Sequence, residues 1–325
     1  MTLHPASTLR VLAATVALTL IPATGAQAVT APSASTGGAA SVTDQSASLT
    51  GSVNPRASAT TYFFQYGPTV AYGSATPEAS AGAGTSARRF VTAVGSLTPN
   101  THYHFRIVAR NAGGTTLGGD RSFTTAKQAL GFTIAATPNP VLFGTTTTVA
   151  GTLTGTGGGN RQIVLQQRQF PYTTPFAQVG NPQLTGADGN FSFPGVVVPQ
   201  NTQFRVQTDK DPTVTSPIVT AGAAVKVSTL TSTTRPRKGR SVRFSGHIYP
   251  ARDGARIGIQ KLNSKKQWVT IAGTITRHSG GTTTSKSRYA KSVRVTRGGS
   301  YRIYALIVDG NYVSNVGRTV KLRTR

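Results

Sequence analysis

Short runs in which apolar and polar residues alternate recur along this chain, and turn residues such as glycine, proline and asparagine separate them. The segment 102–109 (HYHFRIVA), for example, places Tyr103, Phe105 and Ile107 on one side. Alternation with a period of two indicates half-buried antiparallel strands. Helical periodicity is almost absent, so we expect an all-β chain built from tandem sandwich domains.

The N-terminus has the composition of a secretory signal peptide. A charged start ends at Arg10, an apolar run fills 11–21, and small residues around Ala26 and Ala28 supply a cleavage site after Ala28. The apolar run is shorter than the roughly 20 residues that span a bilayer. We expect 1–28 to be removed on export, leaving no integral membrane segment.

Two further features bear on how the exported chain begins and on its source. Residues 29–40 (VTAPSASTGGAA) have little to bury and predict a flexible leader. The chain contains no cysteine, which excludes disulfides, thiolate metal sites and thiol nucleophiles. Exported proteins without disulfides are usual in bacteria, so we expect a bacterial secreted protein.

The first domain carries a family signature. Residues 97–111 (LTPNTHYHFRIVARN) resemble the late-strand pattern of fibronectin type III domains: Leu, Pro and Thr, then a Tyr-x-aromatic-Arg strand ending in Ala-x-Asn. The resemblance covers 41–125 and implies that Tyr103 is a tyrosine corner, with its hydroxyl bonded to nearby backbone. The early-strand tryptophan of animal members is missing. No Arg-Gly-Asp tripeptide occurs, so an integrin-binding role is not implied.

The remainder of the chain is an internal repeat. Four strand-like segments recur at offsets of 95, 94, 92 and 97 residues, for example 163–167 (IVLQQ) and 257–261 (IGIQK). A near-constant offset is expected from tandem duplication of one module. The two copies resemble bacterial extracellular immunoglobulin-like domains, which implies two further sandwiches over 130–222 and 226–325.

The positive charge is concentrated in the last copy. Of 34 lysines and arginines, 22 lie in 226–325, where the only acids are Asp253 and Asp309. Such a field attracts polyanions and extends over a Debye length of roughly 8 Å at physiological salt. The alternative interpretation is that the charge serves only solubility.

Few side chains are available for catalysis or metal binding. The closest acid pair, Asp209 and Asp211, lies in a loop and offers too few ligands for calcium. His102 and His104 face outward without further metal ligands beside them, and no Gly-x-Ser-x-Gly elbow is present. We expect no enzymatic activity, no metal, no cofactor and no small-molecule substrate.

The single tryptophan permits two interpretations. Trp268 aligns with Phe176 in the repeat, and both open a strand. We interpret both rings as core residues, with a sugar-stacking platform as the alternative.

Sandwich topology predicts where the charges of 226–325 lie. In an immunoglobulin-like domain the A–B, C–C′ and E–F connections lie at one end, and the B–C and F–G loops lie at the other. Asp253 and Asp309 fall in the B–C and F–G loops, at the end where the chain enters the domain. The opposite end receives the candidate polyanion-binding residues, which are Arg235, Arg237, Lys238, Arg240, Lys265, Lys266, Arg297, Arg323 and Arg325.

These features together predict a non-catalytic extracellular binding or adhesion protein. We expect it to be retained at the cell surface by anionic cell-wall polymer bound to the basic C-terminal domain. One alternative partner is extracellular nucleic acid such as biofilm DNA, whose phosphates would release counterions on binding. Another alternative is that the domains are accessory modules acting beside a separate secreted polysaccharide hydrolase.

Overall fold

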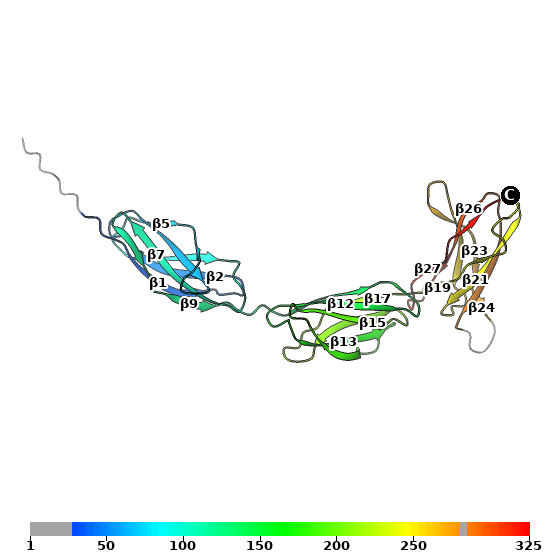
Figure 1. Cartoon of the computed structure of the whole chain (residues 1–325), viewed down its shortest axis with the longest axis horizontal. Helices are drawn as coiled ribbons and strands as arrows, with labels where there is room; N and C mark the ends of the chain where they lie inside the picture. The colour runs from blue at the N-terminus through cyan, green and yellow to red at the C-terminus, as the bar shows by residue number, and fades with distance from the viewer. Residues whose placement is uncertain (1–27, 280–284) are drawn as a thin grey trace, which may run out of the picture. The chain divides into compact units, whose positions relative to one another are not determined.

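The computed structural model describes residues 28–279 and 285–325, and its regular elements are all β-strands (Figure 1). In these residues no helix is long and apolar enough to cross a membrane. The expected signal peptide lies outside the described residues, apart from Ala28. The chain divides into two compact units between Ala126 and Lys127. We call residues 29–126 the first module, 127–224 the second and 225–325 the third; the second compact unit contains the last two.

The first module is a two-sheet sandwich of the fibronectin type III or immunoglobulin-like kind. One sheet has the order β1-β2-β6, with β1 (Ser33–Ala40), β2 (Ala47–Asn54) and β6 (Arg88–Val94). The other has the order β4-β3-β7-β8, with β5 also on β3 and β9 also on β7. Its strands are β3 (Thr60–Gly67), β4 (Ser74–Ala75), β5 (Ala79–Gly82), β7 (His102–Asn111), β8 (Gly114–Leu117) and β9 (Arg121–Thr124).

Alternation along these strands fills the core between the two sheets. Phe64, Phe105 and Ile107 are fully buried, as the period-two pattern predicts. The tyrosine corner is also confirmed, since the backbone N–H of Thr98 donates to the hydroxyl of Tyr103 at 3.0 Å. This bond fixes the chain where it enters β7.

The prediction of a flexible leader over 29–40 is wrong, because β1 is an edge strand paired antiparallel to β2. The hydroxyl of Thr36 accepts a hydrogen bond from the backbone N–H of Ile107 at 3.2 Å. The small residues bring the backbones close together: a Cβ on Gly37 would collide with the side chain of Thr50. Backbone pairing holds this strand, which has no large apolar side chain, so its residues show no alternating pattern.

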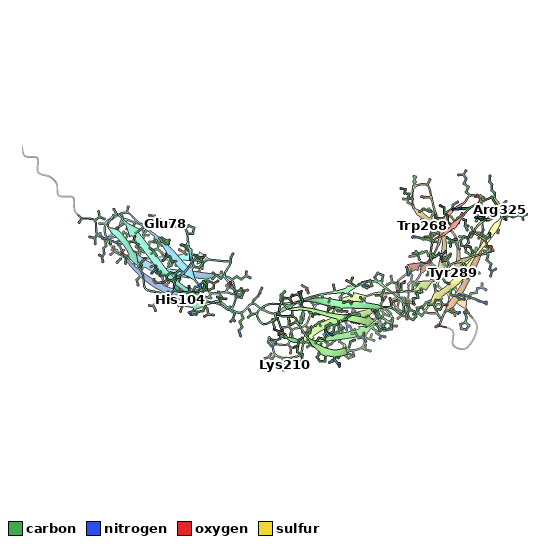
Figure 2. The ribbon with its side chains drawn as sticks, in the orientation of Figure 1. Glu78, His104, Lys210, Trp268, Tyr289 and Arg325 are labelled. Carbon is green, nitrogen blue, oxygen red and sulfur yellow. The ribbon has the colours of Figure 1, made fainter. Side chains whose placement is uncertain are left out.

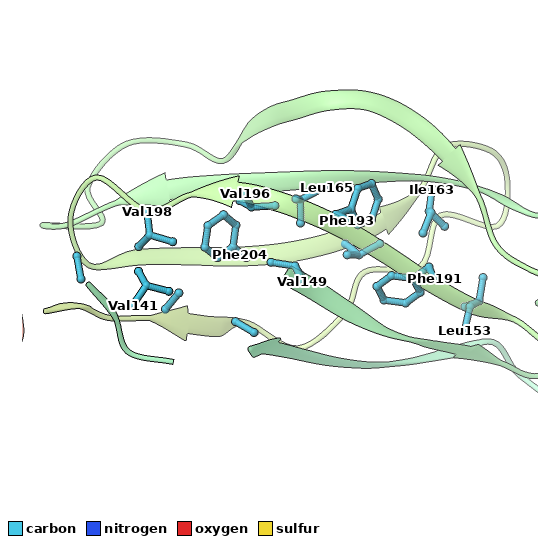
Figure 3. Packing of buried hydrophobic residues seen from close by; sticks show 14 residues of the cluster. Val141, Val149, Leu153, Ile163, Leu165, Phe191, Phe193, Val196, Val198 and Phe204 are labelled. Atoms are coloured by element: carbon cyan, nitrogen blue, oxygen red, sulfur yellow. The ribbon is translucent and has the colours of Figure 1, made fainter. Parts of the chain in front are cut away.

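The second module is a sandwich of the same kind, with a core of aliphatic and aromatic side chains (Figure 3). One sheet has the order β10-β12-β15, with β10 (Gly131–Thr137), β12 (Thr146–Thr154) and β15 (Asn190–Val197). The other has the order β14-β13-β16-β17, with β13 (Gln162–Gln169), β14 (Ala177–Leu184), β16 (Thr202–Thr208) and β17 (Val219–Ala221). A short parallel pair joins β11 (Val141–Leu142) to β18 (Ala223–Ala224).

The third module repeats this plan. One sheet has the order β19-β21-β25-β24, with β20 also on β21; its strands are β19 (Lys226–Val227), β20 (Leu230–Thr231), β21 (Ser241–Tyr249), β24 (Arg277–His278) and β25 (Ser287–Arg294). The other has the order β23-β22-β26-β27, with β28 also on β26; its strands are β22 (Arg256–Leu262), β23 (Trp268–Ile275), β26 (Gly299–Leu306), β27 (Asn315–Val316) and β28 (Val320–Leu322). The segments matched by the internal repeat therefore occupy corresponding strands in the two modules.

The second and third modules are joined by more than a linker. Tyr312 packs against the buried clusters of both, and its ring meets that of Phe143 edge-on, with centroids 5.9 Å apart. The backbone N–H of Asn201 donates to the carbonyl of Asn311 at 2.7 Å. The carboxylate of Asp309 accepts the backbone N–H groups of Asn311 and Tyr312. The two modules thus share one aromatic residue between otherwise separate cores.

Thr36→Val tests whether β1 is an integral strand. Valine keeps the shape of threonine but leaves the buried N–H of Ile107 without an acceptor, which costs about 1–3 kcal/mol. We expect hydrogen exchange of the Ile107 amide to accelerate about tenfold or more. Thr36→Ser keeps the hydroxyl and should retain protection. Equal exchange in all three proteins would contradict the docking of β1.

Candidate anion-binding surface

The nine candidate residues lie in three connections at one end of the third module and in the segment that follows β28. Residues 235–240 connect β20 to β21, 263–267 connect β22 to β23, and 295–298 connect β25 to β26. All nine side chains are exposed. We call this set the basic tip: Arg235, Arg237, Lys238, Arg240, Lys265, Lys266, Arg297, Arg323 and Arg325. Figure 2 marks Arg325, which ends the chain at the tip.

Backbone hydrogen bonds join the connection between β20 and β21, the A–B connection, to residues 323–325. The N–H of Lys238 donates to the carbonyl of Arg325 at 3.2 Å, and the N–H of Arg325 donates to Pro236 at 3.1 Å. The N–H of Arg323 donates to Thr234 at 2.9 Å. This pairing continues the sandwich beyond β28 and places two basic segments side by side.

Side-chain hydrogen bonds hold the connection between β25 and β26, the E–F connection, at the same end of the module. Arg294 donates through Nε to the carbonyl of Gly239 at 3.0 Å. The carbonyl of Arg297 accepts Nζ of Lys261 at 3.2 Å and the hydroxyl of Tyr301 at 3.1 Å. Lys261 and Arg294 are therefore tip cations outside the set that sequence reasoning selected. Arg294 lies between the buried Val293 and Val295, so strand alternation points it outward, but only the folded register shows that it reaches residues 235–240.

The register also places the lysine pair at this end. Lys261 is opposite Tyr301 on β26, and Leu262 is opposite Trp268 on β23. The turn that carries Lys265 and Lys266 follows immediately, beyond the start of β26. The geometry thus brings all nine predicted residues to one end of the module.

The two acids of the third module lie at the opposite end. Asp309 forms an ion pair with Arg252, with 2.7 Å between Oδ2 and Nε. Asp253 accepts the hydroxyl of Ser287 and lies 3.5 Å from Nδ1 of His278. Contacts with the second module are made next to Asp309, so the basic tip is at the end remote from that junction. Among the described residues, no carboxylate forms an ion pair with a tip cation.

The interpretation of Trp268 and Phe176 as core residues is wrong. Both rings are half-buried and lie on the outer face of a sheet. In each module an arginine donates through Nε to the glutamine opposite it on the neighbouring strand, and its guanidinium covers an aromatic ring. The trios are Gln65–Arg106–Tyr72, Gln166–Arg205–Phe176 and Gln260–Arg302–Trp268, with guanidinium-to-ring distances of 4.7, 4.2 and 4.4 Å.

In each module the trio packs the aromatic residue that follows the glutamine's strand against the outer face of the sheet. Because an arginine already covers one face of Trp268, that face is not open for stacking on a sugar. The arrangement recurs in all three modules, including the first, which sequence matching had not aligned with the others. The signal was a glutamine on one strand and an arginine on another, and only the strand register shows that they meet.

The histidines of the first module belong to a polar cluster. Nδ1 of His104 lies 2.8 Å from Oδ2 of Asp120, and the hydroxyl of Tyr72 donates to Oδ1 of the same carboxylate at 2.9 Å. Burial alone would raise the pKa of Asp120, but the hydrogen bonds from His104 and Tyr72 lower it below its ordinary value. Nowhere in the described ranges do three histidines or acids gather to hold a metal.

Comparisons with known proteins add no assignment. No protein-family model matches the sequence, and no curated protein matches it. The structure is similar to that of domains FN1–FN3 of chicken CNTN1, at 16% identity and a TM-score of 0.27, over 90% of this chain and 98% of that one. It is also similar to titin domains A168–A170, at 13% identity and a TM-score of 0.38, over 90% of this chain and 99% of that one. Similarity at this level adds nothing to what the sheet order shows about the fold.

Arg302→Lys tests the trio in the third module. Lysine keeps the charge but loses both the flat guanidinium face and the Nε donor to Gln260. We expect the emission of Trp268, the only tryptophan in the chain, to shift to longer wavelength as water reaches the ring. We also expect the stability of the module to fall by about 1 kcal/mol.

The matched control for this change is Arg205→Lys, which breaks the corresponding trio of the second module. It should leave the emission of Trp268 as it is in the wild type. Unchanged emission in Arg302→Lys would show that the guanidinium does not shield the ring.

Proposed function

We propose that this chain is an exported, non-catalytic binding protein that attaches to anionic cell-envelope polymer through the basic tip of its third module. The observation that carries the proposal is the gathering of nine exposed cations at one end of that module, while both of its acids lie at the other. The apolar run over 11–21 and the small residues up to Ala28 support export. The absence of cysteine is consistent with a bacterial source.

The distribution of the charge favours binding over solubility alone. Solubility requires net charge but sets no requirement on where that charge lies. Charges of one sign gathered at a tip repel each other, and the negative charges of a bound polyanion relieve this repulsion. Binding also releases the polyanion's counterions, which favours the complex further. The tip is formed by loops and by residues 323–325, and its long side chains can adapt to a polymer of irregular shape.

The experiment replaces four cations of the tip, Arg237, Lys238, Arg323 and Arg325, with glutamine. Binding of the full chain to poly(glycerol phosphate), a phosphodiester polymer, is measured across a salt series. Each charge contributes about 0.7–0.9 to the slope of log K against log salt in nucleic acids, so we expect a slope shallower by about 3. Affinity at low salt should fall by about tenfold or more.

The matched control removes four exposed cations from the first module: Arg56, Arg88, Arg89 and Arg121. This variant has the same net charge as the tip variant and should bind nearly as the wild type does. Equal weakening in both variants would show that total charge matters and that the tip does not. Tighter binding of the wild type to duplex DNA than to poly(glycerol phosphate) at the same salt would favour the nucleic-acid alternative.

A further inference from the structure

A second basic surface lies on the outer face of the β19-β21-β25-β24 sheet of the third module. It is a groove of about 600 Å³. The small side chains of Ser245 and Ala290, which face each other across β21 and β25, lie in its lining. Leu230 lines it from β20, and Ile275 lines it from the end of β23. The small residues leave room for a ligand along the strands.

Three arginines and one histidine also line this groove: Arg243, His247, Arg277 and Arg288. Arg288 on β25 is directly opposite His247 on β21 and, on its other side, directly opposite Arg277 on β24. These three residues therefore form a row across the three strands. Arg243 is four residues from His247 along β21, which corresponds to roughly 13 Å in an extended strand. The groove therefore has a group of three at one position and a single arginine further along.

The protein itself does not neutralise this arrangement. Like charges directly opposite each other on adjacent strands are destabilising. Of the module's two acidic side chains, Asp309 pairs with Arg252, and Asp253 contacts Ser287 and His278, the chain neighbours of Arg288 and Arg277. Neither forms an ion pair with Arg243, Arg277 or Arg288. Residues 280–284 (GGTTT) carry no charged side chain in the sequence. The arginines of the groove thus face one another with no anion from the described protein between them.

We propose that this groove binds a single strand of a phosphodiester polymer, with one phosphate held among His247, Arg277 and Arg288 and a second at Arg243. The inference rests on the proposed function and adds the ligand chemistry and a second site to it. Arginine presents a planar fork of donors that matches the oxygens of a phosphate. The volume is within the range of small-ligand sites, which suits a short stretch of one flexible chain rather than a rigid duplex.

The position of His247 gives this site a pH dependence. Its neighbours are cationic or neutral: Arg288 opposite on β25, Lys286 just before that strand, Arg277 on β24, and Tyr249, whose ring is 6.4 Å away. Lys226 on β19 lies opposite Tyr249. Burial, together with Lys286 and Arg288, holds the pKa of His247 below its ordinary value.

A bound phosphate would reverse the sign of the local potential. The imidazole would then gain a proton on binding, because the anion stabilises its charged form. By linkage, affinity rises as pH falls from the pKa of His247 in the complex towards its lower pKa in the free protein, and binding takes up protons between these two values. A phosphodiester does not itself titrate near neutral pH, so the uptake reports the protein.

The first experiment compares Arg277→Gln/Arg288→Gln with a variant that removes two exposed cations outside both the groove and the basic tip, Arg256→Gln/Arg318→Gln. Calorimetry measures binding of a glycerol phosphate oligomer to each full-length protein. We expect the groove variant to lose about tenfold or more in affinity and the control to lose about threefold or less. Polyglutamate of equal charge should lose affinity similarly in both variants.

The second experiment repeats the titration at pH 6 in two buffers of different ionisation enthalpy. The wild type should take up a fraction of a proton per site, and His247→Gln should take up none. Trp268 lies on the opposite sheet, so its unchanged emission verifies that each variant is folded. Proton uptake retained in His247→Gln, or groove and control variants that bind alike, would overturn the proposal.

The failure of this inference can be told from the failure of the proposed function. If the groove variant binds like its control while the tip variant loses affinity, the groove is wrong and attachment through the tip stands. If the wild type binds neither the phosphodiester oligomer nor polyglutamate, both proposals are wrong.

Discussion

Burial of apolar side chains is the main interaction that holds the two sheets of each module together, because the chain has no cysteine to link them. Fully burying one large aliphatic or aromatic side chain contributes about 1.5–3 kcal/mol, and each core contains about a dozen buried hydrophobic residues. Most core strands therefore alternate, with apolar residues inward. The same constraint leaves every second position outward, where the core places no demand on chemistry.

The third module uses these outward positions for cations. Val242 and Phe244 are fully buried, and Arg243 between them points outward into the groove. Tyr301 and Ile303 are buried on either side of Arg302, whose guanidinium covers Trp268. A core of ordinary composition thus carries an outer surface of extreme charge. The cost is electrostatic repulsion among the cations, and it does not disturb the packing.

Most of the fold could be predicted from the sequence because alternation is a local property. The strand around Tyr103 and its tyrosine corner were predicted from fifteen residues. The position of the basic tip followed from the order of strands, since topology decides at which end each connection lies. Residues 29–40 were misjudged because β1 is held by backbone pairing and by the close approach of Gly37.

The features missed at the surface share a different cause. The glutamine–arginine–aromatic trios and the row formed by His247, Arg288 and Arg277 join residues from strands that are distant in sequence. A shift of one residue in register would move every partner to the other face. Alternation identifies which residues point outward, but it does not identify which of them are neighbours. Only the folded register supplies that information.

Tyr312 restricts rotation between the second and third modules more than a plain linker would, because its ring packs against the cores of both. Swivelling one module against the other requires the ring to leave two apolar clusters and breaks the N–H bond from Val313 to the carbonyl of Ala223, which measures 2.8 Å. Rotation between the two modules is therefore opposed by these contacts as well as by the chain that joins them.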